Sequence, residues 1–204
     1  MHYAHSNTWL SKHVSDQFVK KSKRFGYRSR AWFKLNEIQK INNVISPGMT
    51  VLDLGSSPGG WSQYASKQVK KQGHVISCDI QPMHAIPKVS FILGDVFKKN
   101  ILNNIFKKIK NKIDVILCDI APNITGITEI DHPKCINMNY KILNLYRSIL
   151  LKNGIFVIKS FHGSDLITFY TEIKQLFNKI KIFKPNASRA HSKEIYIIAI
   201  GYKK

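Results

Sequence analysis

Acidic side chains are scarce in this sequence of 204 residues. It has 12 Asp and Glu against 32 Lys and Arg, which gives a formal net charge of +20 at pH 7. This excess is larger than solubility requires, so a polyanionic partner such as nucleic acid is expected. The alternative source of the charge is a biased base composition of the coding sequence, because the chain is also rich in Ile and Asn.

Cysteine is also rare, and long apolar runs are missing. The three cysteines, Cys78, Cys118 and Cys135, include no CxxC pair, which argues against a disulfide framework and a zinc site. No apolar run approaches the roughly 20 residues that span a bilayer, and the first ten residues lack the apolar core of a signal peptide. We expect a soluble protein without a metal or a membrane partner, in a reducing compartment that is cytoplasmic or organellar, such as the mitochondrion.

Basic residues are densest near the start of the chain. Residues 1–48 hold nine Lys and Arg against two acidic residues. Apolar positions at helical spacing predict helices over 9–20 and 30–43. In the second helix Lys34 continues an apolar stripe, where it either has a function, extends its charge to solvent, or pairs with Glu37 one turn away.

After a turn signal at 46–48, short apolar runs alternate with helical stretches. This alternation predicts a mostly parallel sheet with helices on both faces, in which ligands bind at the carboxyl ends of the strands. The predicted strands lie at 51–54, 74–78, 89–93, 113–118, 155–158, 180–183 and 195–200, and the predicted helices at 60–71, 97–110, 137–151 and 165–178.

A glycine-rich turn, DLGSSPGGW at 53–61, follows the first predicted strand. Gly55, Gly59 and Gly60 would let the backbone approach a ligand, and the start of the next helix would offer free N–H groups to an anion. The spacing is not the GxGxxG of dinucleotide-binding enzymes, which disfavours a dehydrogenase. A turn that needs glycine only for its own geometry is the alternative.

Three acids stand at the ends of successive predicted strands. Asp79 follows the second strand, Asp95 the third after one glycine, and Asp119 the fourth. They would face one crevice, where a carboxylate can accept hydrogen bonds from ribose hydroxyls. We therefore favour a cofactor site over helix capping. Cys78 and Cys118 are interpreted as buried strand residues rather than nucleophiles.

Two further charged residues flank later strands. Lys159 ends the fifth predicted strand, where a lysine is costly unless it is paired, and Glu194 opens the last strand. With Lys34 and Asp119 they could form one cluster. Ordinary solvated strand ends are the alternative, and the spacing alone does not show that the four residues meet.

The chain resembles the FtsJ/RlmE family of ribosomal RNA 2'-O-ribose methyltransferases over nearly its whole length. The resemblance lies in RSRAWFKL at 28–35, DLGSSPGGWSQ at 53–63, CDIQPM at 78–83, DIAPNITG at 119–126 and SRAHSKEIY at 188–196. It implies a Rossmann-like α/β fold with a seven-stranded, mostly parallel sheet, an antiparallel last strand and helices on both faces. It also implies a catalytic tetrad of Lys34, Asp119, Lys159 and Glu194.

The resemblance further implies S-adenosyl-L-methionine as the cofactor. The implied cofactor contacts are Gly55, Pro58, Gly59, Gly60, Trp61, Asp79, Asp95 and Asp119. Ser56 and Ser57 stand where the family commonly has two alanines, away from the tetrad. We expect one domain, with a basic helical segment at 1–48 and the cofactor-binding and catalytic core at 49–204.

The implied substrate is the 2'-hydroxyl of a ribose, in a uridine of large-subunit ribosomal RNA. The implied partner is ribosomal RNA or the pre-ribosomal large subunit, which a monomer would contact through basic residues at 20–30. The alternatives are transfer RNA, an mRNA cap, or an inactive RNA-binding assembly factor. Lys159 is expected to act as the base, which would need desolvation and the like charge of Lys34 to lower its pKa, whereas Asp119 acts in the opposite direction. Asp119 and Glu194 are expected to hold the two lysines in place and to keep one of them charged.

Overall fold

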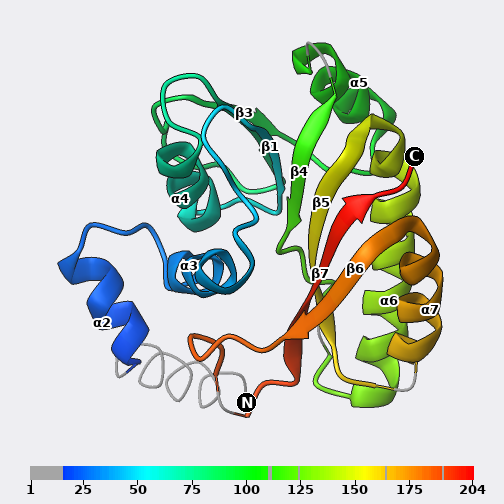
Figure 1. Ribbon diagram of the computed structural model, residues 1–204. Coiled ribbons are helices and arrows are strands. Elements are labelled where there is room, and N and C mark those ends of the chain that lie inside the picture. The colour runs from blue at the N-terminus through cyan, green and yellow to red at the C-terminus, as the bar shows by residue number, and fades with distance from the viewer. Residues whose placement is uncertain (1–15, 110–111, 124, 164, 190) are drawn as a thin grey trace.

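The computed structural model describes residues 16–109, 112–123, 125–163, 165–189 and 191–204. Their centre is a seven-stranded sheet of order β3-β2-β1-β4-β5-β7-β6 (Figure 1). The strands are β1 Thr50–Leu54, β2 His74–Asp79, β3 Val89–Leu93, β4 Ile113–Cys118, β5 Leu150–Phe161, β6 Phe177–Phe183 and β7 Glu194–Tyr202. β7 pairs antiparallel with both β5 and β6, and the other strand pairs are parallel. The predicted fold class is therefore confirmed.

Helices cover both faces of this sheet. They are α3 Ala31–Asn42, α4 Gly60–Gln68, α5 Lys99–Lys108, α6 Thr128–Tyr146 and α7 Asp165–Leu176, with a 3-10 turn at Arg147–Ile149. A further helix, α2 Gln17–Arg24, packs on α3 through Phe18 and Phe33. One apolar core joins the sheet to α3 and α4, and a second joins it to α5, α6 and α7 (Figure 1). Among the described residues, no helix is both long and apolar enough to cross a membrane.

The strand sequences explain this layering. In β1, Val51 packs into the core under α3 and α4, whereas Leu52 and Leu54 pack into the core under α5, α6 and α7. Successive side chains on a strand point to opposite faces, and both faces are buried here. For this reason the central strands are apolar at nearly every position rather than at every second one.

Helix α2 carries the basic stretch of the N-terminal segment. It begins after Asp16, whose carboxylate accepts a hydrogen bond from the Phe18 backbone N–H at 2.8 Å. It ends before Gly26, which has a φ of 67°. Positions 9–15 of the helix predicted at 9–20 lie outside the described residues, and the helix continues past 20 to Arg24.

The prediction of a helix at 137–151 is wrong at both ends. Helix α6 already begins at Thr128, and β5 begins at Leu150. The Asp131 carboxylate accepts hydrogen bonds from the Thr125 and Gly126 backbone N–H groups at 2.9 Å, which shapes the turn into the helix. Pro133 in this polar first part of α6 hides the helical pattern in the sequence.

Candidate active site

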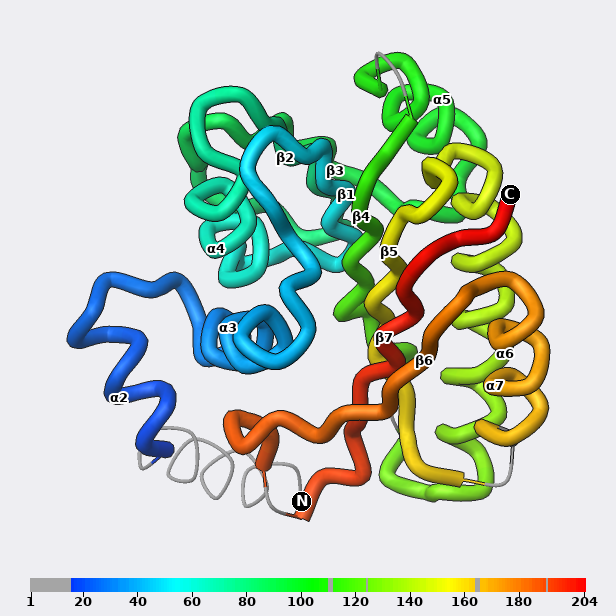
Figure 2. Tube along the Cα trace, viewed as in Figure 1, coloured from blue at the N-terminus to red at the C-terminus, as the bar shows by residue number. Residues whose placement is uncertain are grey.

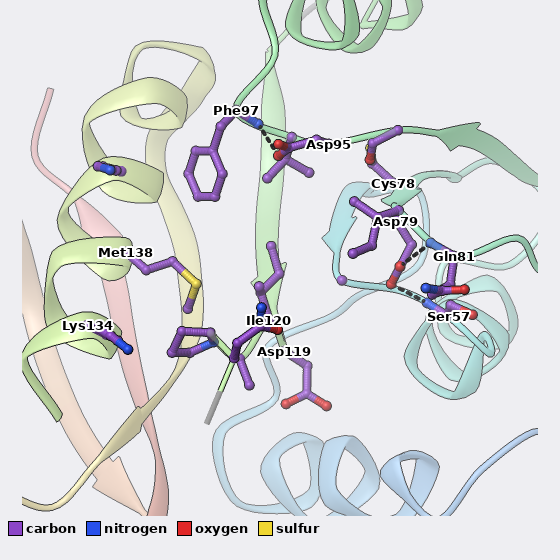
Figure 3. Close-up of a pocket in the computed structure, with 18 of the residues that line it drawn as sticks. Ser57, Cys78, Asp79, Gln81, Asp95, Phe97, Asp119, Ile120, Lys134 and Met138 are labelled. Carbon is purple, nitrogen blue, oxygen red and sulfur yellow. Dashed lines mark hydrogen bonds between the residues drawn. The ribbon is translucent and has the colours of Figure 1, made fainter. Parts of the chain in front are cut away.

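A cavity of about 780 Å³ opens at the carboxyl ends of β1 to β4, against α6 (Figure 3). Four of the predicted cofactor residues line it, namely Gly55, Asp79, Asp95 and Asp119. Its other lining residues are Ser57, Cys78, Ile80, Gln81, Gly94, Val96, Phe97, Ile120, Ala121, Pro122, Asn123, Lys134, Asn137, Met138 and Lys141. Carboxylates and apolar side chains thus share one space.

Backbone N–H groups fix two of the cavity's carboxylates. Asp79 accepts hydrogen bonds from the Ser57 and Gln81 N–H groups, each at 2.8 Å, and Asp95 accepts one from the Phe97 N–H at 2.9 Å (Figure 3). Each carboxylate oxygen has further acceptor capacity. The cavity therefore offers fixed acceptors for hydroxyl or amino groups, beside apolar surface that suits a planar base.

The predicted residues Pro58, Gly59, Gly60 and Trp61 lie around the start of α4 and do not line the cavity. Gly59 has a φ of 106°, and a Cβ there would lie 2.9 Å from Arg28 Cδ. No side chain caps α4, and its first three residues, Gly60, Trp61 and Ser62, are buried. The Trp61 ring is buried, and its Nε1 donates to the Ala31 carbonyl at 2.9 Å, so only its backbone can meet a ligand.

Arg28 supports the glycine turn, a role that the sequence reasoning missed. Its guanidinium donates to the carbonyls of His84 and Ala85 at 2.6 Å and of Pro58 at 3.3 Å. Its backbone N–H donates to Gln63 Oε1 on α4 at 3.1 Å. The N-terminal segment is thereby tied to both loops that border the cavity. In the sequence, only the place of Arg28 in the RSRAWFKL segment pointed to a role, and the spacing of apolar residues around it gave no indication.

The four residues of the predicted tetrad do meet. Lys159 Nζ lies 3.1 Å from Asp119 Oδ1 and also donates to the Asp119 carbonyl at 2.7 Å. Lys34 Nζ lies 2.6 Å from Glu194 Oε1. Glu194 stands at the start of antiparallel β7, opposite Phe161 at the end of β5, which brings the two pairs to the same edge of the sheet.

Glu37 is not the partner of Lys34. Its carboxylate instead accepts hydrogen bonds from the backbone N–H groups of Asn186 at 2.7 Å and Ala187 at 3.0 Å. These residues belong to the segment between β6 and β7, which runs beside α3 (Figure 2). Glu37 thus fixes the segment that leads to Glu194 and leaves Lys34 free to bind Glu194.

Tyr196 joins the two ion pairs, and the sequence reasoning missed it. Its hydroxyl accepts a hydrogen bond from Lys34 Nζ at 3.2 Å and donates one to Asp119 Oδ1 at 2.8 Å. Burial, and then the charges of Asp119 and Glu194, raise the pKa of Tyr196 well above its ordinary value, so the hydroxyl stays protonated. Strand alternation could have identified Tyr196, because residues 194 and 196 of one strand share a face with each other.

The pKa values within this cluster correct one expectation. Burial alone would lower the pKa of Lys159, but the charges of Asp119 and Glu194 outweigh it and raise that pKa. Burial would raise the pKa of Asp119, but the charges of Lys159 and Lys34 outweigh it and lower that pKa. The lowered pKa that the role of a base needs is therefore not found, and the opposing effect of Asp119 prevails, because Lys159 contacts the Asp119 carboxylate and Lys34 is paired with Glu194.

The cysteines take no part in this chemistry. Cys78 and Cys118 are buried in β2 and β4, and burial raises the pKa of each thiol to about 12. A thiol with so high a pKa is a poor nucleophile at neutral pH. The interpretation of both as buried strand residues is confirmed.

Known methyltransferases are similar to this chain in sequence. The model of the family described as FtsJ-like methyltransferase matches residues 27–202. A "Ribosomal RNA large subunit methyltransferase E" of Wigglesworthia glossinidia brevipalpis is 58% identical over 97% of both chains. One of the same name from Buchnera aphidicola is 48% identical over 95% of both chains.

A solved structure gives the same result at the level of the fold. The crystal structure described as that of a ribosomal RNA methyltransferase from Plasmodium falciparum superposes with a TM-score of 0.78 at 28% sequence identity. The match covers 86% of this chain and 98% of the other. On the family model, the relatives and the fold together, this chain belongs to the FtsJ-like methyltransferase family.

Proposed function

We propose that this protein transfers the methyl group of S-adenosyl-L-methionine to the 2'-hydroxyl of a ribose in large-subunit ribosomal RNA. The observation that carries the proposal is the hydrogen-bonded cluster of Lys159, Asp119, Tyr196, Lys34 and Glu194 at the edge of the cavity. The family and the names of the two relatives support the same reaction and the same class of RNA. A uridine as the target stays a prediction.

The cavity fits the cofactor. Asp79 has a fixed carboxylate for ribose hydroxyls, and Asp95 beside Phe97 suits the amino group and ring of adenine. Contacts of the cofactor with Pro58, Gly59, Gly60 and Trp61, which lie beside the cavity and do not line it, stay predictions. When bound, the cofactor supplies a methyl group that its sulfonium sulfur already activates.

The remaining chemistry is alignment of the ribose hydroxyl and removal of its proton. In our proposal Lys159 binds the hydroxyl oxygen through a remaining N–H, while Asp119 holds the ammonium in place. Because its pKa is raised, Lys159 must first release a proton to solvent, and the lone pair of its neutral amine then accepts the proton of the hydroxyl as the oxygen takes the methyl group. Lys34 stays paired with Glu194 and, through Tyr196, supports the orientation of Asp119.

The organisation of the chain is part of the same proposal. We assign 1–204 to one domain, because Leu35 and Ile38 of the basic segment share a core with β1 and β4. We further propose a monomer. We also propose a reducing compartment, cytoplasmic or organellar, and the three free cysteines support this compartment. Light scattering of the purified protein tests the oligomeric state, and a dimeric mass would contradict this part.

Ribose-methylation mapping by mass spectrometry tests the reaction. Unmodified large-subunit RNA and transfer RNA are each incubated with the protein and the cofactor. The proposal expects one new 2'-O-methyl mark in large-subunit RNA and none when Asp79→Ala replaces the wild type. A mark on transfer RNA alone would overturn the substrate, and no mark on either RNA, with cofactor binding intact, would indicate an RNA-binding protein without catalysis.

Thermal unfolding with added ligands tests the cofactor. At a hundredfold excess over its dissociation constant, a specific ligand stabilises the folded state by about 3 kcal/mol. We expect S-adenosyl-L-methionine to raise the melting temperature and NAD to leave it unchanged. A rise with NAD alone would contradict the assignment of the cavity.

A further inference from the structure

Phe25 is a large apolar side chain left on the surface in the most basic part of the described structure. It follows the last residue of α2 and is 57% exposed. Its neighbour Arg24 places its guanidinium carbon 5.7 Å from the ring centroid. A single exposed apolar side chain is common on protein surfaces, so the surroundings of the ring decide whether it marks a contact.

The ring belongs to a packed row of aromatic side chains. Phe25 lies 5.9 Å from Tyr27, tilted by 32°, and Tyr27 stacks on Trp32 with 3.8 Å between centroids and 5° between planes. Trp32 in turn meets Phe33 edge to face at 5.3 Å. The other rings of the row belong to α3 or pack against it, and their contacts hold the Phe25 ring in position, as a stacking surface requires.

The helix that precedes this ring carries four positive charges. Lys20, Lys21, Lys23 and Arg24 of α2 are all exposed. Within the part of the chain that the structure describes, none of the four forms an ion pair with a carboxylate. The only acid at this helix, Asp16, is bound to Arg30.

The aromatic row is also connected to the active site. Phe33 directly precedes Lys34 on α3, and Phe18 of α2 packs against Phe33 with 5.4 Å between centroids. Arg30 binds the Ala187 carbonyl in the segment before Glu194. An RNA strand bound along α2 is therefore held by the same elements that position Lys34 and Glu194.

We propose that Phe25 is a stacking site for an unpaired base of the RNA substrate, with the four cations of α2 binding the adjoining phosphates. This inference rests on the proposed function and names one contact of its substrate. An exposed ring stacks on any base face, and neighbouring lysines and arginines match the phosphates on either side. A wholly apolar partner fits poorly, because it would bury four unpaired cations.

Binding of fluorescein-labelled RNA to three Phe25 variants tests the proposal. Loss of one stacked base weakens binding about tenfold, so Phe25→Ala should raise the dissociation constant for single-stranded RNA by that factor. Phe25→Trp should restore it, and Phe25→Leu should not, because leucine is apolar without a flat ring. A blunt RNA duplex, whose bases are already stacked, should bind Phe25→Ala and wild type alike.

A matched control is Ile167→Ala, which removes a side chain that is 72% exposed on α7, on the other face of the sheet. It should leave RNA binding unchanged. Wild-type affinity in Phe25→Ala, full rescue by leucine, or an equal loss with the duplex would each overturn the stacking site.

Methyl transfer to large-subunit RNA separates this proposal from the function on which it rests. With an active wild type, Phe25→Ala should raise KM about tenfold and leave kcat unchanged. An unchanged KM beside an active wild type would overturn the stacking site alone. An inactive wild type would overturn the proposed function, and the binding comparison would still decide whether Phe25 stacks on RNA.

Discussion

At the scale of single residues, the site depends on one buried ion pair. Lys159 is only 8% exposed. Its buried charge is stabilised because Nζ lies 3.1 Å from Asp119 Oδ1 and donates a further hydrogen bond to the Asp119 carbonyl. The same contacts that stabilise the lysine in a buried strand also keep it protonated. In the proposed reaction, Lys159 therefore loses this proton before it can act as a base.

Replacing Lys159 by Met tests this role. We expect methyl transfer to fall by at least about a hundredfold, because a general base contributes that much or more, with cofactor affinity nearly unchanged. Single-turnover rates and calorimetric titration with the cofactor measure the two effects. Lys152→Met, at an exposed position of the same strand, is the control and should retain full activity.

The raised pKa of Lys159 predicts a pH dependence. Below that pKa the neutral amine increases about tenfold per pH unit, so the single-turnover rate should rise with pH from 7 to 9 at saturating RNA and cofactor. A rate that does not change with pH over this range would show that Lys159 orients the hydroxyl as an ammonium and that the proton leaves by another route.

Tyr196→Phe tests the link between the two ion pairs. The ring would still pack near Trp61, with 5.5 Å between centroids, but the hydrogen bonds to Lys34 and Asp119 would be removed. We expect kcat to fall about tenfold, since one hydrogen bond to a charged group is worth roughly 1.5 kcal/mol, with KM for RNA unchanged. Tyr140→Phe removes an exposed hydroxyl bound to Glu172 and serves as the control. Equal kcat values in both variants would contradict a positioning role for Tyr196.

At the scale of elements, our proposals assign RNA binding to α2 and a catalytic side chain to α3. Helix α3 carries Lys34 into the cluster, whereas α2 packs on α3 through Phe18 and keeps its cations at the surface. Arg28, between the two helices, holds the loops around the glycine turn. In this proposal, the segment that binds RNA and the turn that binds the cofactor are linked directly through Arg28.

Neutralising the cations of α2 tests the RNA surface. Changing Lys20, Lys21, Lys23 and Arg24 to Gln should weaken RNA binding and flatten its salt dependence, by about 0.7 in the logarithmic slope for each phosphate that the variant no longer binds. The same change at Lys98, Lys99, Lys107 and Lys108, which are exposed at α5, is a control of equal charge. An identical salt slope in both variants would place the RNA on another surface.

At the scale of the whole molecule, one buried acid should make stability depend on pH. Asp53 at the end of β1 is fully buried and accepts a hydrogen bond from Ser62 Oγ at 2.6 Å. Burial, opposed by this hydrogen bond and reinforced by the charges of Asp119 and Asp79, raises the pKa of Asp53 to about 7. In the unfolded chain the pKa of an aspartate is about 3.9.

Between these two pKa values the folded protein binds a proton that the unfolded chain does not. The contribution of Asp53 to the free energy of unfolding is therefore complete below pH of about 4 and is lost as the pH rises to about 7. Asp53→Asn should remove this loss. Urea unfolding at pH 5 and pH 8 should show a decrease in the wild type that is a few kcal/mol larger than in the variant, and equal decreases would contradict the buried, protonated Asp53.

The sequence by itself determined the order of the strands along the chain, the glycine turn and the acids at the strand ends. These features are local, because a strand buried on both faces is apolar throughout and a parallel sheet puts its carboxyl ends at one edge. Element ends were less predictable. Pro133 hid the start of α6, and only the packing of β5 against β4 shows that Leu150 belongs to a strand.

The tertiary structure alone decided which charges pair. In the sequence Lys34 stands one turn from Glu37, yet its partner is Glu194, because Glu37 binds the backbone of the segment before β7. The pKa of Lys159 likewise follows from Asp119 at 3.1 Å rather than from burial. Electrostatic interactions depend on distances between residues far apart in the chain, and these distances are set only once β7 has paired between β5 and β6 in the folded sheet.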